Sequence, residues 1–194
     1  MLLIGIDVGT SSCKVALYNP EGKIIGKEST EYSVETPRES WVELDHRKVF
    51  EAIKSTVRQL IGNFGEGQTE YQMSFSVLGD SVIPCGGNGE SLGNALLPLD
   101  NRSFSNVLKM REDFDLRKLY HITGRVPHTM AAITRVMWLL DNFNAEEAEI
   151  ELFLDLQSWL MNELGFYPVT DFSSIAGSMF FDLENNEYSD RMLN

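Results

Sequence analysis

The fold is decided by the stretch Gly5-Ile6-Asp7-Val8-Gly9-Thr10-Ser11-Ser12-Cys13-Lys14, near the start of the chain. It joins two apolar runs, Leu2–Ile6 and Lys14–Tyr18, each of a length typical of a buried strand. Walker A loops and dinucleotide-binding loops lead from a strand into a helix, so this strand-to-strand turn belongs to neither class. The stretch therefore predicts a hairpin whose turn is made of small and hydroxylated residues.

The residues of this turn suit the binding of a phosphate group. Gly9 allows a close approach of the backbone, and Thr10–Ser12 offer N–H groups and hydroxyls as donors. Asp7, at the end of the first strand, can hold Mg²⁺ directly or through water beside such phosphates, and Lys14 lies near the same charge. Spacing alone leaves open a second interpretation, in which the turn is an ordinary hairpin connection and Asp7 is a solvated strand end.

The pattern beyond the hairpin predicts an α/β domain built around a mixed sheet. Residues 19–22 form a turn signal, and Lys23–Tyr32 then continues an antiparallel meander as its third strand. Further along, we expect a helix that begins after a cap at Asp45 and is ended by Gly62 and Gly65. The remaining predicted elements are a strand over Tyr71–Val77 and helices over Ala131–Leu140 and Glu147–Leu164.

The composition excludes several functional classes. The chain has 194 residues, of which 43% are hydrophobic, as in an ordinary globular domain. Lys and Arg number 16 against 29 Asp and Glu, so the net charge is −13 and binding to nucleic acid or to an anionic membrane surface is not expected. The two cysteines lack metal-ligand or redox spacing and the N-terminus lacks a signal peptide, which favours a cytoplasmic location.

Five further stretches, together with the first turn, carry a resemblance to a known family. They are Glu31–Asp45, Ser74–Pro84, Ala95–Arg102, Arg135–Leu140 and Thr170–Leu183. In this order along the chain, they resemble the FGGY family of carbohydrate kinases, in particular its xylulokinase and gluconokinase branch. Heat-shock chaperones and actins, which belong to the same superfamily, share only the first turn.

The resemblance implies a ribonuclease-H-like (actin-like ATPase) domain, with three antiparallel N-terminal strands in a mixed sheet and flanking helices. It implies ATP and Mg²⁺, transfer of the γ-phosphoryl group to a hydroxyl of a sugar, sugar acid or polyol, and it allows a homodimer of the full-length enzyme. Matched residue by residue, the nucleotide-phosphate contacts are Gly9, Thr10, Ser11, Ser12 and Lys14. The metal-side acid is Asp7, and the substrate-binding residues are Gly79, Asp80, Asp100 and Arg102.

Two of the chain's departures from the family pattern concern a substrate-binding position and the length. Gly79 offers no side chain at the first of two paired substrate-binding positions. The family's general-base Asp and its C-terminal nucleotide-binding domain fall beyond residue 194, so we interpret residues 1–194 as an incomplete N-terminal kinase domain that is inactive alone. The alternatives are a non-catalytic sugar- or nucleotide-binding module of the same fold and, on the first turn only, a chaperone-like or actin-like ATPase.

Overall fold

The computed structural model describes residues 1–65, 67–143 and 149–193. The contacts between residues divide the chain into two compact units, each assembled from two separate stretches of sequence. Unit 1 consists of Met1–Val34 and Asp45–Leu78, and unit 2 consists of Glu35–Leu44 and Gly79–Asn194.

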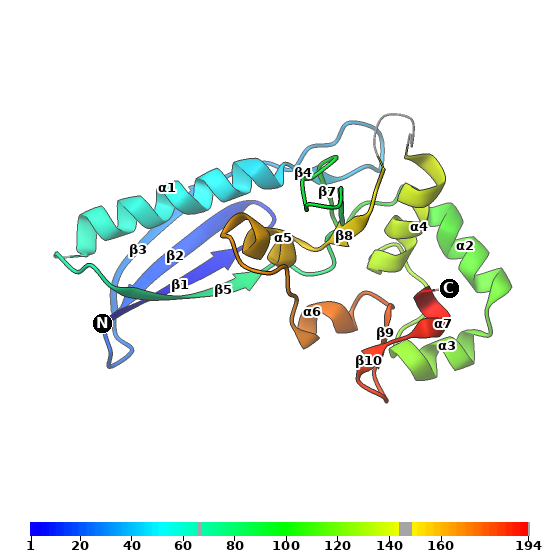
Figure 1. Cartoon of the computed structure of the whole chain (residues 1–194). Coiled ribbons are helices and arrows are strands. Elements are labelled where there is room, and N and C mark those ends of the chain that lie inside the picture. Colours follow the sequence, from blue (N-terminus) through cyan, green and yellow to red (C-terminus); the bar gives the residue numbers. More distant parts are fainter. Residues whose placement is uncertain (66, 144–148, 194) are drawn as a thin grey trace. The chain divides into compact units, whose positions relative to one another are not determined.

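Unit 1 is a four-stranded mixed sheet with a helix on one face. The strands β1 (Leu2–Val8), β2 (Ser12–Tyr18) and β3 (Ile24–Glu31) form the predicted antiparallel meander. The strand β5 (Tyr71–Val77) pairs parallel with β1, so the sheet order is β3-β2-β1-β5. Figure 1 shows the helix α1 (His46–Phe64), in cyan, lying along this sheet. The predicted α/β class with a mixed sheet is confirmed.

The core of unit 1 follows from the periodicities of its strands and helix. Alternate residues of β1 and β2 are buried, namely Ile4, Ile6, Val8, Cys13, Val15 and Leu17. The helix α1 supplies Val49, Ile53 and Leu60 at helical spacing. Because buried positions alternate along each strand, the residues between them lie on the opposite face of the sheet, which carries the polar side chains described below.

The ends of α1 agree with the sequence prediction at all but one residue. The side chain of Asp45 accepts a hydrogen bond from the N–H of Lys48, which caps the first turn as predicted. The helix ends at Gly65, whose N–H donates to the carbonyl oxygen of Ile61. The prediction that Gly62 also ends the helix is wrong. Gly62 lies inside α1 on its exposed side, where a glycine costs only about 1 kcal/mol relative to alanine and packing of the opposite face prevails.

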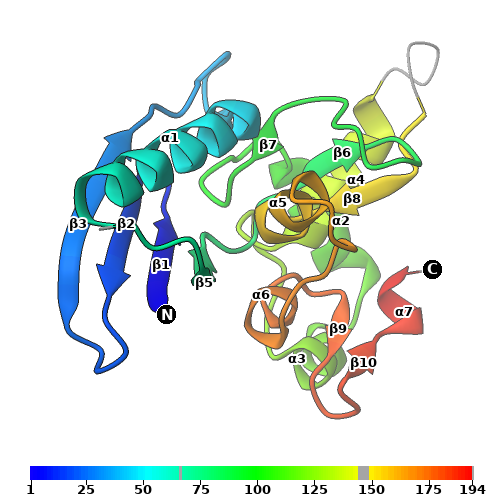
Figure 2. The same ribbon diagram turned by 60° about the vertical axis from the view of Figure 1, so that its left-hand side comes forward.

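Unit 2 consists of short strands and helices around two apolar clusters, and Figure 2 gives a clear view of its C-terminal elements. Its antiparallel strand pairs are β4 (Glu43–Leu44) with β7 (Ala95–Leu96), β6 (Ile83–Cys85) with β8 (Leu152–Leu154), and β9 (Phe181–Asp182) with β10 (Glu187–Tyr188). Its helices are α2 (Phe104–Asp113), α3 (Leu116–Thr123), α4 (Ala132–Asn142), α5 (Leu156–Glu163), α6 (Phe172–Ala176) and α7 (Asp190–Leu193). Within the described ranges, no helix combines the length and the apolar character needed to cross a bilayer.

The helix predicted over Glu147–Leu164 is wrong in its first half. Residues 147 and 148 lie outside the described residues, and the apolar run Leu152–Leu154 forms β8 rather than a helical turn. The helix α5 begins only after Asp155, whose carboxylate accepts a hydrogen bond from the N–H of Ser158 at 2.6 Å. The helical spacing of the apolar residues was misleading here, because pairing with β6 and the cap at Asp155 decide the local structure.

Candidate functional site

The predicted phosphate turn lies in unit 1, between β1 and β2. The strand β2 begins at Ser12, two residues earlier than predicted, so the turn is reduced to Gly9, Thr10 and Ser11. Tyr32 holds this turn: its hydroxyl donates to the carbonyl oxygen of Gly9 at 2.8 Å, and its N–H donates to the carbonyl oxygen of Ser11 at 3.0 Å. The side chains of Thr10 and Ser11 are exposed and form no hydrogen bond within the described part of the chain, so they are available to a ligand.

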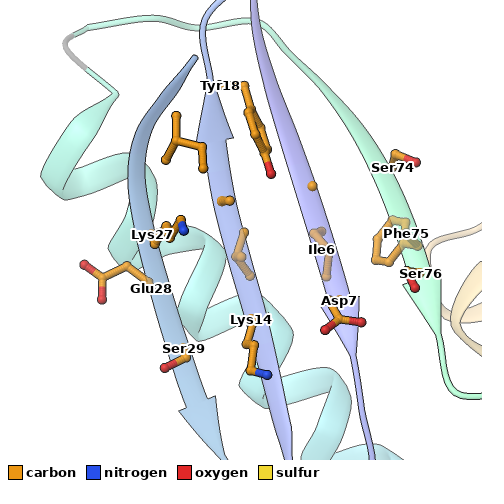
Figure 3. A pocket seen from close by; sticks show the side chains of 14 residues that line it. Ile6, Asp7, Lys14, Tyr18, Lys27, Glu28, Ser29, Ser74, Phe75 and Ser76 are labelled. Atoms are coloured by element: carbon orange, nitrogen blue, oxygen red, sulfur yellow. The ribbon is translucent and has the colours of Figure 1, made fainter. Parts of the chain in front are cut away.

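A row of polar side chains crosses the sheet face beside this turn. The strand register places Asp7 of β1 between Lys14 of β2 and Ser76 of β5, and places Ser29 of β3 next to Lys14. Figure 3 shows these side chains on neighbouring strands, where they line an open cavity of about 670 Å³. All four are exposed. One ligand on this face can therefore meet a carboxylate, an ammonium group and two hydroxyls.

This donor set fits a metal–phosphate group better than a metal ion alone. Among the residues that the structure describes, no three His, Cys, Asp or Glu side chains gather as a metal site. Mg²⁺ commonly takes one or two protein carboxylates and completes its octahedron with waters and phosphate oxygens. Asp7 fits the role of such a single carboxylate ligand, with the Lys14 ammonium positioned to attract a neighbouring phosphate.

The ionisable groups behind the turn remain neutral. Burial, and secondarily the negative charge of Asp7, raises the pKa of the Cys13 thiol to about 11. Burial likewise raises the pKa of Tyr32, with smaller contributions from Cys13 and Asp7. The Tyr32 hydroxyl therefore keeps its proton and continues to donate to Gly9.

Gly79 and Asp80, two of the predicted substrate-binding residues, lie at the start of Gly79–Asn194, the longer stretch of unit 2. Asp80 has a φ of 56°, in the left-handed region that residues other than glycine rarely adopt. The fully buried guanidinium of Arg135 donates to the carbonyl oxygen of Asp80, and also to the carbonyl oxygens of Thr129 and Met130. A buried arginine thus ties the backbone of the Asp80 turn to residues 129 and 130.

The Asp80 carboxylate is only partly satisfied by its surroundings. Its side chain is 16% exposed, and Oδ2 lies 3.6 Å from Nη1 of Arg125. Oδ1 is buried and has no hydrogen-bond partner among the described residues. Burial raises the pKa of Asp80, against the lowering effect of Arg125 and Arg135. At Gly177, a Cβ atom would lie 2.6 Å from Oδ1, so only glycine leaves the carboxylate this position. An unpaired buried acceptor is costly, and the exposed part of the Asp80 side chain is where a ligand hydroxyl can donate.

The other two predicted substrate-binding residues, Asp100 and Arg102, form a buried ion pair. Nε of Arg102 donates to the two oxygens of Asp100 at 2.9 and 3.0 Å, and Nη2 donates to Asp100 at 2.8 Å and to Glu43 at 2.7 Å. The guanidinium carbon of Arg102 lies 3.7 Å from the ring centre of Trp41 and 5.1 Å from that of Trp138. Asp100 and Arg102 are therefore brought together and engaged chiefly with each other, with Glu43 and the two indole rings completing the cluster.

The guanidinium of Arg135 interacts electrostatically with two of the predicted substrate-binding residues, Asp80 and Asp100. Burial lowers the pKa of Arg135 to about 10, while the charges of Asp80 and Asp100 oppose this shift and that of Arg102 adds to it. The guanidinium stays protonated near neutral pH, so Arg135 is a fixed positive charge at this position.

Sequence reasoning missed three residues that surround Asp80. Arg125 and Asp155 were not singled out, and Arg135 was noted only as part of an aliphatic helix. A signal for Asp155 was present, because an Asp followed three residues later by Ser158 inside an apolar segment is compatible with a helix cap. The spacing of Arg125 and Arg135 carried no such signal.

Comparison with known proteins identifies the class to which this sheet and these sites belong. The model of the FGGY family of carbohydrate kinases, N-terminal domain, matches residues 2–194. The chain therefore belongs to the FGGY family of carbohydrate kinases.

Individual relatives agree with this assignment. A gluconokinase of Bacillus licheniformis is 25% identical over 191 residues, which are 98% of this chain and 37% of the relative. The ligand-bound xylulose kinase of Lactobacillus acidophilus is 25% identical and superimposes with a TM-score of 0.90, over 99% of this chain and 39% of that one. The glycerol kinase of Plasmodium falciparum, solved with ADP, is 19% identical and shares the fold with a TM-score of 0.90, over 98% of this chain and 40% of that one. The chain thus spans about 40% of the length of these relatives.

Proposed function

We propose that this chain is the N-terminal part of an ATP-dependent carbohydrate kinase and is inactive without the remainder of the enzyme. The observation that carries the proposal is the polar row that includes Asp7 and Lys14, beside a turn with exposed hydroxyls. The chain that carries this row belongs to a family of carbohydrate kinases. MgATP, when bound, supplies the γ-phosphoryl group that is transferred. The acceptor is a hydroxyl of a sugar, sugar acid or polyol.

The residues of unit 1 serve the nucleotide in this proposal. The hydroxyls of residues 10–12 and the N–H groups of Thr10 and Ser11 donate hydrogen bonds to phosphate oxygens, while the N–H of Gly9 donates to the carbonyl oxygen of Ser12 and Tyr32 keeps the turn in place. Asp7 binds Mg²⁺ directly or through a water, and Lys14 offsets the phosphate charge. The ADP in the related glycerol kinase supports a nucleotide ligand for this fold.

The residues of unit 2 serve the acceptor. Asp80 accepts hydrogen bonds from the acceptor's hydroxyls, a task for which its partly exposed carboxylate is suited. Gly79 leaves open space, because no atom lies within 4 Å of the position that a Cβ would take. The substrate role of Asp100 and Arg102 stays a prediction, and their contacts support a role in holding the segment that carries them. A general-base Asp beyond residue 194, a cytoplasmic location and a homodimer also remain predictions.

The proposal is tested on the full-length protein that contains this chain, by measuring ADP release with a panel of sugars, sugar acids and polyols. Thr10→Ala should raise the KM for ATP, and Asp80→Ala should raise the KM for the acceptor, each by roughly five- to twelvefold, because one ligand hydrogen bond contributes about 1–1.5 kcal/mol. The matched controls are Thr69→Ala, before the opposite end of β5, and Asp113→Ala, on the exposed side of α2.

Two outcomes would contradict the proposal. Steady-state constants that are unchanged in both Thr10→Ala and Asp80→Ala would refute the assignment of the two sites. Ligand binding without any phosphoryl transfer by the full-length protein would favour the non-catalytic sugar- or nucleotide-binding module instead.

A further inference from the structure

The Asp80 carboxylate borders a small pocket inside unit 2. The pocket has a volume of about 190 Å³, below the roughly 300–1,000 Å³ of sites that bind drug-sized ligands, so it suits a ligand smaller than these. Its walls include apolar side chains of α4 and β8, among them Val136 and Phe153. The polar lining includes Asp80, Asp155, Thr170, Ser174, Ser178 and Tyr188.

The charged groups that line this pocket are all carboxylates. Within the described part of the chain, no Lys, Arg or His borders it, whereas Asp80 and Asp155 both do. Oδ1 of Asp155 accepts a hydrogen bond from the N–H of Ser158, and Oδ2 accepts one from the hydroxyl of Thr170 at 2.5 Å, so both oxygens of this carboxyl group act as acceptors. Burial raises the pKa of Tyr188, and the charge of Asp155 adds to this effect, as expected of a negative local field.

The two nearby arginines do not turn the pocket into an anion site. The guanidinium of Arg135 is fully buried and donates to three backbone carbonyl oxygens, of Asp80, Thr129 and Met130. Arg125 is 45% exposed, is paired with Asp80 and does not line the pocket. A ligand in the pocket therefore meets carboxylates and hydroxyls, while the cationic groups are committed elsewhere.

We propose that this pocket holds an uncharged polyol or sugar and discriminates against acceptors that carry a carboxylate. Hydroxyls of a neutral acceptor can donate to the partly exposed carboxylate of Asp80, whereas the carboxylate of an acidic acceptor offers acceptors only and adds a negative charge beside Asp80 and Asp155. The inference deepens the proposed function and rests on it, since it assumes that the Asp80 pocket receives the phosphoryl acceptor.

The test compares acceptors of equal carbon number that differ in charge, using the full-length protein and ADP release. Suitable pairs are D-gluconate with D-glucitol, and D-xylonate with D-xylulose and xylitol. We expect kcat/KM for the better neutral member of a pair to exceed that of the acid by at least about tenfold. Asp80→Asn removes one negative charge and adds an N–H donor, so it should reduce this ratio at least tenfold by raising KM for the neutral acceptor and lowering it for the acid. Asp113→Asn, an identical change on the exposed side of α2, should leave the ratio unchanged.

The outcomes separate the inference from the function on which it rests. Phosphorylation of the acids equally well or better would overturn the inference and leave the kinase proposal standing. A ratio that Asp80→Asn does not move would show that the acceptor is not selected in this pocket, which also overturns the inference. If Asp80→Asn fails to fold, Asp155→Asn, which retains an oxygen for the Ser158 cap, provides the same comparison. No phosphorylation of any acceptor would overturn the proposed function itself.

Discussion

Removal of the Asp100 carboxylate should lower the free energy of unfolding of unit 2 by about 3–5 kcal/mol, the usual effect of breaking a buried ion pair. Asp100 is fully buried and accepts hydrogen bonds from the N–H of Val42 at 2.6 Å and from the N–H and guanidinium of Arg102 at 2.8 to 3.0 Å. In Asp100→Ala, two backbone donors lose their acceptor, and the Arg102 guanidinium keeps only Glu43. Each unsatisfied buried donor costs about 1–3 kcal/mol, which accounts for the expected total.

Urea unfolding followed by tryptophan fluorescence measures this loss in unit 2 specifically. The three tryptophans, Trp41, Trp138 and Trp159, all belong to unit 2, and two of them contact the Arg102 guanidinium. With a slope of about 2 kcal/mol per molar urea, the midpoint should fall by about 1.5–2.5 M. Asp100→Asn keeps one acceptor oxygen but loses the charge, so its midpoint should lie between those of the unchanged protein and Asp100→Ala.

The matched control is Asp113→Ala, on the exposed side of α2, which should change the free energy of unfolding by less than about 0.5 kcal/mol. The reasoning would be refuted if Asp100→Ala shifted the midpoint no more than this control does. A large rise in the KM for the acceptor without any shift of the midpoint would instead indicate that Asp100 contacts substrate.

Two other predictions concern buried groups. Arg135→Met should destabilise unit 2 by more than about 2 kcal/mol in the same urea assay, because three carbonyl oxygens lose their donor. Arg135→Lys should recover part of this loss. Equal stability of the unchanged protein and both variants would contradict the role of Arg135. Both cysteines are buried, so neither thiol of the native protein should react with Ellman's reagent at pH 8, whereas both should react after denaturation. Because the pKa of Cys13 is raised from 9.0 to about 11 in the folded protein, the contribution of the neutral Cys13 thiol to stability is complete below pH 9 and is lost as the pH rises towards 11. A thiol that is titrated rapidly in the native protein would contradict this account.

Much of unit 1 was predictable because its signals are local and periodic. Alternation along β1 and β2, the cap at Asp45 and the helical spacing of α1 all agree with the packing that they produce. Agreement between propensity and packing fails at Leu152–Leu154, where the spacing of apolar residues fits a helix but the partner strand, Ile83–Cys85, lies far away in the sequence. Spacing carries no information about such a distant partner, so β8 was not foreseen.

The candidate sites likewise include residues that the sequence indicates and surroundings that it does not indicate. The register that sets Asp7 beside Lys14 follows directly from a tight hairpin, so the sequence indicated both residues. The surroundings of Asp80 depend on residues separated from it by 45 to 97 positions, from Arg125 to Gly177, and only the folded chain reveals them. The ion pair between Asp100 and Arg102 illustrates a third case, because its residues were recognised by resemblance while the contact of Arg102 with two tryptophans was not.

The interleaving of the two units has a consequence for the order of folding. Unit 1 needs Asp45–Leu78 for α1 and β5, so it can close once residue 78 has been synthesised, with Glu35–Leu44 looped out between its two halves. The looped segment bonds to itself, because Glu35 and Glu43 form an antiparallel bridge. Its bonds to the rest of unit 2 form only when Ala95–Leu96 pairs with β4 and Asp100 accepts the N–H of Val42. Loop closure of this length adds little entropy cost, but the docking of the segment waits for later residues. A folding intermediate that stops before residues 95–100 are in place would therefore combine a folded sheet with a β4 strand that has not yet met β7, and that strand is where misassembly should begin.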